Sequence, residues 1–276
     1  KSKNLCLSGG VVLNSVMTGK LTFDWYGKRF DKVYVCPVPY DSGLAIGAAQ
    51  YVWHQYLDNP RITWEDNFTP YLGFKYDESQ VQEAIENKSN LVKTTKSTKR
   101  QVAELLADSN IISVFSAGSE SGRRALGNRS ILADPRNPDM KDIINKKVKH
   151  RQWFRPFAPS ILREKVSEWF EHDISSPYMS FVVPFKEEVR GKVPAVVHFD
   201  GTARLQTVTE NDNKWYYDFL KTWEEVSGVP IVLNTSFNDR EPIVETPEHA
   251  LNCFLKTDID YLYFADFNIL VSKLDD

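Results

Sequence analysis

The chain has 276 residues and a formal net charge of −3, because 37 acidic residues slightly outnumber 34 lysine and arginine residues. A chain of this length can bury a substantial core, and typical domain sizes favour two folded units. No stretch approaches the roughly 20 apolar residues of a membrane span, and no basic-then-apolar signal peptide stands at the start. We therefore expect a cytoplasmic protein without a membrane partner.

The first residues predict two strand–loop–helix units. The sequence NLCLSGG is an apolar strand that leads into Gly9 and Gly10, and an amphipathic stretch follows. Glycines of this kind let backbone amides approach an anion at the positive end of a helix. Residues 33–57 repeat the layout, with Asp41 in the loop and small residues that favour close packing of the helix. Because a natural domain rarely starts inside its core, we expect a fragment of a longer protein.

The cysteines form no disulfide or metal-binding pattern. Cys6, Cys36 and Cys253 are an odd number at wide spacing, the five histidines are scattered, and no CxxC or HExxH motif occurs. We expect reduced thiols that lie in the core.

Polar residues dominate the segment 59–98, which we interpret as an interdomain connection with one short helical pattern. A second unit then begins near Lys99. Its predicted strands lie near residues 111–115, 181–185, 195–199, 205–208, 230–234 and 261–271, and its predicted helices near residues 99–110, 137–149, 213–226 and from 246 onward. This alternation predicts a mixed α/β (α+β) fold in which Trp215, Phe219 and Trp223 form a core stripe.

The segment GRRALGNRSILADPR, from Gly122 to Arg136, predicts an anion-binding loop. From Arg123 to Lys165 the sequence has twelve lysine and arginine residues but only four aspartate and glutamate residues. This local excess, in a protein of negative net charge, favours a phosphate- or carboxylate-bearing ligand.

Two kinds of basic residue occur in this region. Lys141, Lys146 and Lys147 fit a solvated helix face. The arginines differ because they lie beside Gly, Asn, Pro and aromatic residues; these are Arg124, Arg129 and Arg155.

Six ordered motifs resemble those of the NodU/CmcH-type O-carbamoyltransferases. They are SGGVVLN, PYDSGLAIGAA, SESGRRALGNRSILADPR, WFRPFAP, FDGTARLQTV and VLNTSFNDREPIVETPEHAL. The resemblance covers nearly the whole chain. It implies the C-terminal part of an actin-like ATPase-fold domain, related to the tRNA threonylcarbamoyltransferases, over residues 1–58. A linker over residues 59–98 and a YrdC-like domain with a twisted mixed sheet over residues 99–276 would follow.

The resemblance also implies an activity. In that family the YrdC-like domain makes carbamoyl adenylate from carbamoyl phosphate and ATP, with Mg²⁺, and releases phosphate and pyrophosphate. The carbamoyl group then passes to the hydroxyl of a small-molecule acceptor at a site in the actin-like domain that holds a divalent metal ion, iron or zinc. The chain would be part of an enzyme that modifies a secondary metabolite, a nodulation factor or a glycan.

Site residues follow from the same resemblance. Lys149-His150-Arg151 and Ser236-Phe237-Asn238 match the K-x-R and S-x-N patterns of YrdC-like proteins. The implied catalytic residues are Lys149, Arg155, Arg204 and Ser236. The implied residues for carbamoyl phosphate and nucleotide are Arg124, Arg129, Arg151, Asn234 and Asn238. Alternatively, Asn234, Ser236 and Asn238 cap backbone groups in a turn.

In the first unit, Gly9, Gly10 and Asn14 match half of the family's nucleotide loop. Asp41 matches a metal-binding aspartate whose histidine partners belong to the preceding half of the family's domain. The alternative is that Asp41 is the N-cap of the helix ahead of Gly43.

The chain departs from the family pattern beside the arginine loop. Ser116, Ala117 and Gly118 stand where members typically read Gln-Gly-Arg/Lys, and Arg123 replaces a usual proline. The lost basic residue would weaken donor binding unless Arg123 restores the charge.

Two other functions fit parts of the sequence. YrdC-like folds can present basic surfaces to RNA, but the whole chain is acidic and lacks the aromatic–basic alternation typical of base stacking, so nucleic acid is not an expected partner. A catalytically decayed interaction domain would explain the altered residues at positions 116–118. Apolar surface on an incomplete first domain would favour a homodimer.

Overall fold

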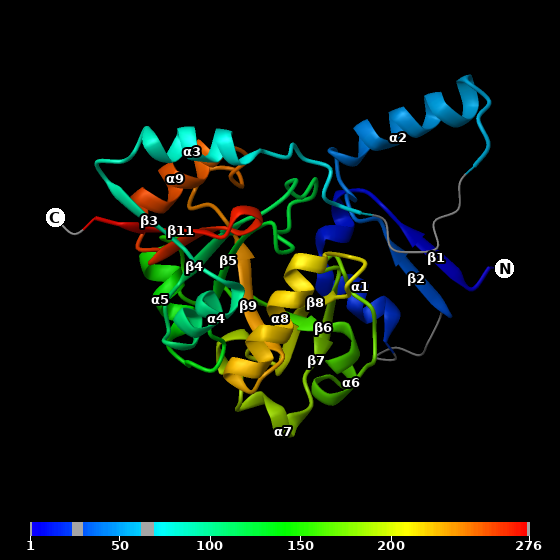
Figure 1. Ribbon diagram of the computed structural model, residues 1–276. Coiled ribbons are helices and arrows are strands. Elements are labelled where there is room, and N and C mark those ends of the chain that lie inside the picture. Colours follow the sequence, from blue (N-terminus) through cyan, green and yellow to red (C-terminus); the bar gives the residue numbers. More distant parts are fainter. Residues whose placement is uncertain (1, 24–29, 62–68, 275–276) are drawn as a thin grey trace.

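The computed structural model describes residues 2–23, 30–61 and 69–274, which form two sheets with surrounding helices (Figure 1). The larger is a nine-stranded mixed sheet with the strand order β3-β11-β10-β4-β5-β9-β6-β8-β7. Its strands are β3 (Val92–Lys96), β4 (Ile112–Phe115), β5 (Arg129–Ala133), β6 (Ala158–Leu162), β7 (Phe181–Pro184), β8 (Thr202–Val208), β9 (Ile231–Ser236), β10 (Tyr261–Phe264) and β11 (Ile269–Lys273). The predicted mixed α/β class is confirmed.

Seven helices of the described chain accompany this sheet: α3 (Glu78–Glu86), α4 (Lys99–Ala107), α5 (Met140–Lys147), α6 (Val166–Trp169), α7 (Glu187–Arg190), α8 (Lys214–Ser227) and α9 (Pro247–Lys256). Local sequence sets several of their ends. Thr98 and Gln101 form a reciprocal capping box at the start of α4, and Gly228, with φ 76°, ends α8 in the left-handed region.

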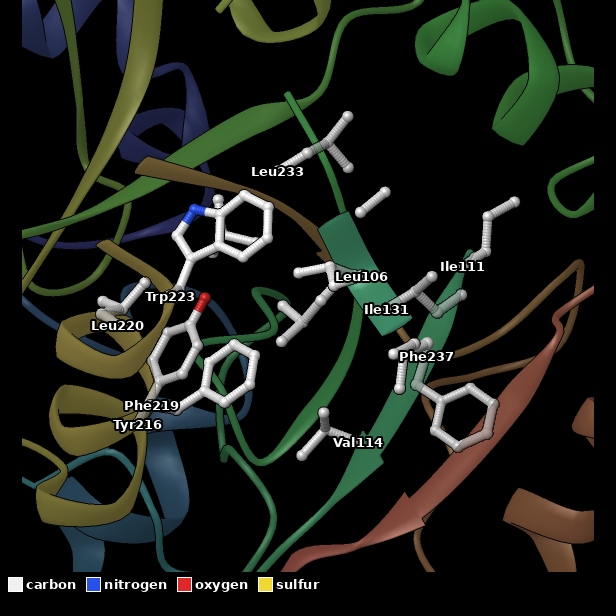
Figure 2. Packing of buried hydrophobic residues seen from close by; sticks show 14 of the residues in the cluster. Leu106, Ile111, Val114, Ile131, Tyr216, Phe219, Leu220, Trp223, Leu233 and Phe237 are labelled. Carbon is white, nitrogen blue, oxygen red and sulfur yellow. The ribbon is translucent and has the colours of Figure 1, made fainter. Parts of the chain in front are cut away.

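A large part of the core lies between α8 and the sheet (Figure 2). Phe219 and Trp223 are completely buried, and Trp223 Nε1 donates a hydrogen bond to the carbonyl oxygen of Ile231 on β9 at 2.7 Å. Trp215 is half-buried and stacks on Phe219. The predicted aromatic core stripe is therefore confirmed.

The first unit is a two-stranded parallel sheet, β1 (Asn4–Leu7) and β2 (Lys32–Val35), with α1 (Ser15–Thr22) and α2 (Gly43–Tyr51). The helix α1 packs on β7: Thr18 Oγ1 donates to the carbonyl oxygen of Ser180. A Cβ at Gly19 would come within 2.5 Å of the carbonyl oxygen of Val182, so only glycine allows this close approach.

Two expectations for the first unit are wrong. The helix α2 projects away from the rest of the chain (Figure 1), and none of its residues is buried, so the expected close packing is not found among the described residues. Cys6 is exposed and Cys36 is half-buried, and only Cys253 lies in the core as expected.

Several predicted boundaries also change. Residues 195–199 were expected to be a strand, but Pro194–Val196 is a 3-10 helix. The helix expected from Asn137 begins at Met140, because Asn137 Oδ1 instead accepts a hydrogen bond from the backbone N–H of Asp139 at 3.0 Å. Strands β5 and β6 were not predicted.

Part of the segment expected to be a linker is built into the second unit. Residues 78–98 contain α3 and β3, and β3 pairs with β11 at the edge of the sheet. Residues 62–68 of that segment lie outside the described residues. Within the described ranges, no helix has both the length and the apolar character needed to cross a bilayer.

Candidate functional site

A cavity of about 280 Å³ opens beside the ends of β6 and β9. Five arginine side chains line it: Arg123, Arg124, Arg151, Arg155 and Arg204. The other lining residues are Ala125, Pro156, Phe157, Ala158, Met179, Asn234, Thr235 and Ser236. No aspartate or glutamate of the described residues belongs to this lining, so the arginine cavity lacks an internal counter-charge.

Arg204 on β8 shows the electrostatic consequence most clearly. The pKa of Arg204 is lowered to about 9, mainly by burial and to a smaller extent by the positive charges of Arg124 and Arg151. The guanidinium still carries its charge at neutral pH, and its buried Nε has no hydrogen-bond partner in the described part of the chain. Such a group is costly without a bound anion.

Arg124 and Arg151 at the cavity also have lowered pKa values. Arg124 Nη2 donates to the carbonyl oxygen of Leu13 in the first unit at 3.0 Å, and burial and Arg123 lower its pKa. Burial, followed by the charge of Arg155, lowers the pKa of Arg151 to about 10. The structure therefore brings the predicted binding arginines together, with one exception.

The exception is Arg129, which does not line the arginine cavity. Its side chain is fully buried on β5. Nη1 donates to the carbonyl oxygens of Ser116 at 2.6 Å and Asn128 at 3.0 Å, and the guanidinium carbon lies 3.5 Å from the ring centroid of Phe115. These contacts secure the segment before β5. The predicted anion-binding loop therefore ends near residue 128, where the central strand begins.

Lys149 lies against the wall of the cavity, where its Nζ is surrounded by oxygen atoms of Ser236 and Asn238. It donates to the carbonyl oxygen and Oδ1 of Asn238 at 2.7 and 2.9 Å, and to Oγ of Ser236 at 3.3 Å. Burial, followed by the charge of Arg151, lowers the pKa of Lys149 to about 7. The K-x-R and S-x-N segments are thus neighbours in space.

Ser236 and Asn238 also make the contacts of a turn. Ser236 Oγ donates to Asn238 Oδ1 at 2.7 Å, and Asn238 Nδ2 donates to the carbonyl oxygen of Glu241 at 2.6 Å. The turn-capping interpretation holds for Asn238, which bonds a backbone carbonyl, whereas Ser236 Oγ bonds the side chains of Asn238 and Lys149. The role of both residues in ligand binding stays a prediction.

Asn234 instead joins neighbouring segments inside the sheet. Its Nδ2 donates to the carbonyl oxygen of Ala125, to Ser160 Oγ and to Gln206 Oε1, at 2.9 to 3.1 Å. Asn234 therefore ties the arginine loop to the β6–β8 part of the sheet.

The predicted half of a nucleotide loop in the first unit lies outside the arginine cavity. Gly9, with φ 88°, and Gly10 are in open surroundings, and Asn14 Oδ1 caps α1 by accepting from the backbone N–H of Met17 at 3.1 Å. These three residues do not line the arginine cavity.

Asp41 is exposed in the turn before α2. The N-cap of this helix is Ser42, which makes no side-chain cap, so the N-cap interpretation of Asp41 is wrong. Among the described residues, no group of three or more His, Cys, Asp or Glu side chains is arranged to hold a metal ion. Asp41 alone does not fit an iron or zinc site.

Local contacts explain the residues found at positions 116–118, where the chain departs from the family pattern. Asp266 accepts from Ser116 Oγ at 2.9 Å and from the backbone N–H of Ala117 at 2.6 Å, and Ala117 has φ 39°. A Cβ at Gly118 would lie 2.5 Å from the carbonyl oxygen of Gly73. A basic side chain at position 118 would require this backbone to move, whereas Arg123 already lines the cavity.

Sequence reasoning missed two residues that support the site. Glu120 is buried, and its Oε1 accepts from the backbone N–H groups of Leu126 and Asn128 at 2.7 and 2.9 Å. Burial raises the pKa of Glu120. Asn145 holds the loop of Arg151 and Arg155. For Asn145, the available signal was a polar residue on the buried face of a predicted helix.

Comparisons with known proteins identify the family of the chain. The family model described as "Carbamoyltransferase C-terminus" matches residues 103–272, and that described as "Carbamoyltransferase N-terminus" matches residues 1–50. Nodulation protein NolNO of Sinorhizobium fredii is 41% identical over 97% of this chain and 40% of its own length. For nodulation protein NolO of Bradyrhizobium diazoefficiens the values are 40%, 95% and 48%.

An uncharacterized protein of Synechocystis, sll1178, is 39% identical over 96% of the chain and 47% of its own length. The chain thus spans less than half the length of these three relatives. A solved structure of full-length HypF in the phosphate- and nucleotide-bound form aligns with a TM-score of 0.43 at 13% identity, covering 90% of this chain and 36% of HypF. On the evidence of the family model that matches most of its length, the chain belongs to the carbamoyltransferase family.

Proposed function

We propose that the arginine cavity binds carbamoyl phosphate together with the phosphates of ATP, and that this part of the protein forms carbamoyl adenylate. The observation that carries the proposal is the group of five guanidinium side chains around about 280 Å³, with no carboxylate from the described residues in the lining. Guanidinium groups match phosphate oxygens with paired donors. Membership of the carbamoyltransferase family supports a carbamoyl donor as the anion.

The proposed reaction balances with one water molecule. Water attacks carbamoyl phosphate, which breaks into carbamate and inorganic phosphate. A carbamate oxygen then attacks the α-phosphorus of ATP, the bond to the β-phosphate oxygen breaks, and pyrophosphate leaves. The product is carbamoyl adenylate, and Mg²⁺ accompanies the ATP phosphates.

The chain's own residues supply fixed positive charge for both steps. Arg124, Arg151, Arg155 and Arg204 are placed to stabilise the negative charge that develops on the phosphoryl oxygens. Lys149, held beside Ser236, adds a charge that strengthens when an anion binds, because a nearby anion favours the protonated form of lysine. Asn234 and Ser236 line the cavity and would contact carbamate and adenylate, and Asn238 would act beside them although it is not part of the lining.

In the whole protein we propose that the carbamoyl group passes from the adenylate to an acceptor hydroxyl, with release of AMP. The names of the nodulation relatives favour a hydroxyl on a nodulation factor or a related glycan; a secondary metabolite is the other class. No step is assigned to an iron or zinc ion, because the described residues around Asp41 do not fit one.

The test is pyrophosphate release by the purified chain with ATP, Mg²⁺ and carbamoyl phosphate, with carbamoyl phosphate omitted as the control. Release that depends on carbamoyl phosphate is the expected result. Arg155→Ala and Ser236→Ala should each lower the rate by about tenfold or more. Arg100→Ala is the matched control, because Arg100 pairs with Glu104 and Glu225 and does not line the cavity. A folded chain that releases no pyrophosphate would contradict the proposal.

A further inference from the structure

Asn145 lies on α5, below the loop that carries Arg151 and Arg155 to the cavity. Its side chain is only 1% exposed and does not line the cavity. Asparagine is unfavourable inside a helix, and a buried amide is costly unless its polar atoms are paired. The partners of this amide all belong to the loop 151–155.

The hydrogen bonds determine how the amide of Asn145 is oriented. Nδ2 donates to the carbonyl oxygens of Trp153 at 3.2 Å and Arg155 at 2.9 Å. Carbonyl oxygens only accept, so the NH₂ side of the amide faces them. Oδ1 therefore faces Arg151 and accepts from its Nε at 2.6 Å. The backbone carbonyl of Asn145 also accepts from the backbone N–H of Arg151, at 3.0 Å.

These contacts aim the guanidinium of Arg151. Its Nε edge is bonded to Asn145, and the guanidinium carbon lies 4.7 Å from the ring centroid of Phe157. Among residues 2–23, 30–61 and 69–274, this side chain makes no other hydrogen bond that would occupy Nη1 or Nη2. Both Nη atoms therefore remain available for an anion in the cavity.

We infer that Asn145 is a positioning residue for anion binding, which holds Arg151 directly and Arg155 through the main chain. The inference rests on the proposed function of the arginine cavity. It adds a residue that never touches the ligand but orders two side chains that do. Ordering these arginines before the ligand arrives lowers the entropy that binding costs.

The first test is calorimetric titration of the chain and its Asn145→Ala variant with inorganic phosphate and with fresh carbamoyl phosphate. Loss of the hydrogen bonds should weaken binding of both anions about tenfold. Asn110→Ala is a matched control, because Asn110 Nδ2 bonds the carbonyl oxygen of Leu105 at 2.7 Å and the residue does not line the cavity. This variant should keep the wild-type Kd.

A pair of double-mutant cycles separates positioning from general destabilisation. If Asn145 acts through Arg151, the losses for Asn145→Ala and Arg151→Ala combine to clearly less than their product. Arg204 lies on β8. When Asn145→Ala is combined with Arg204→Ala, the two losses of affinity should multiply. Multiplication in both cycles would overturn the inference.

The outcomes also distinguish the inference from the proposed function. If the wild-type chain binds neither anion, the proposed function fails and the inference fails with it. If the wild-type chain binds both and Asn145→Ala binds them equally well, only the inference fails. Should Asn145→Ala not fold, NMR of the wild-type chain decides. The arginine Nε–H resonance that Arg151→Lys removes should exchange slowly with water and shift on adding phosphate, and rapid exchange would overturn the inference.

Discussion

The Nζ atom of Lys149 donates a hydrogen bond to the carbonyl oxygen of Ser236 at 2.5 Å and lies 3.3 Å from the hydroxyl oxygen of the same residue. These residues are 87 positions apart in the chain. Ser236 lines the arginine cavity, whereas Lys149 is buried behind it. The lysine thus adds its charge to the cavity from behind the wall.

The buried position of Lys149 predicts a pH-dependent stability. Its pKa of about 7 lies below the ordinary value of 10.5, so between these values the unfolded chain binds a proton that the folded chain lacks. The contribution of Lys149 to the free energy of unfolding therefore rises with pH above 7, by on the order of 1 kcal/mol per pH unit. Denaturant unfolding at pH 7, 8 and 9 should show this rise for the wild-type chain relative to Lys149→Met.

The comparison of the two proteins removes the contributions of other titrating groups, because those are shared. A constant difference in unfolding free energy from pH 7 to 9 would show that Lys149 stays protonated. Saturating phosphate should flatten the difference, since an anion in the cavity favours the charged lysine.

Replacing Arg204 should affect stability and anion binding in opposite directions. Burial and the charges of Arg124 and Arg151 disfavour its guanidinium when no anion is bound. Arg204→Met should therefore leave the phosphate-free chain as stable as the wild type, or more stable by about 1 kcal/mol. Binding of inorganic phosphate should weaken about tenfold or more, because a charge-assisted donor is lost.

Thermal unfolding with and without phosphate checks both parts of this prediction. Phosphate should raise the Tm of the wild-type chain and of the surface control Arg100→Met, but raise that of Arg204→Met much less. An Arg204→Met variant that is clearly destabilised without phosphate, and that gains as much from phosphate as the wild type, would contradict the assignment of Arg204 to the anion site.

At Glu120 we expect the hydrogen-bond acceptor to contribute more to the free energy of unfolding than the carboxylate charge. Its Oε1 accepts three backbone N–H groups, from Leu126, Asn128 and Arg129, while Oε2 is buried without a hydrogen-bond partner in the described chain. Glu120→Ala should lower the free energy of unfolding by about 2–3 kcal/mol, because buried donors lose their partner. Glu120→Gln keeps an acceptor and should stay within about 1 kcal/mol of the wild type at pH 7. Equal losses in denaturant unfolding would show that the carboxylate charge is required.

Much of the secondary structure could be predicted because its causes are local. Capping residues such as Thr98 and Thr246 mark helix starts, and the aromatic spacing of α8 marks its buried face. The missed strands β5 and β6 are short and carry Arg129 and Pro159, which local patterns do not associate with a sheet interior. Their strand conformation depends on pairing with β9, which is a long-range contact.

The sequence by itself determined the excess of positive charge, the two strand–loop–helix starts and the motifs of a carbamoyltransferase, because charge, periodicity and motif spacing are properties of neighbouring residues. Only the tertiary structure decided which arginines share a cavity. Arg151, Arg155 and Arg204 face it together, whereas Arg129 is turned into the backbone around Ser116. That choice depends on which face of each strand is buried and on which carbonyl groups folding leaves without partners, and neither can be read from a linear sequence.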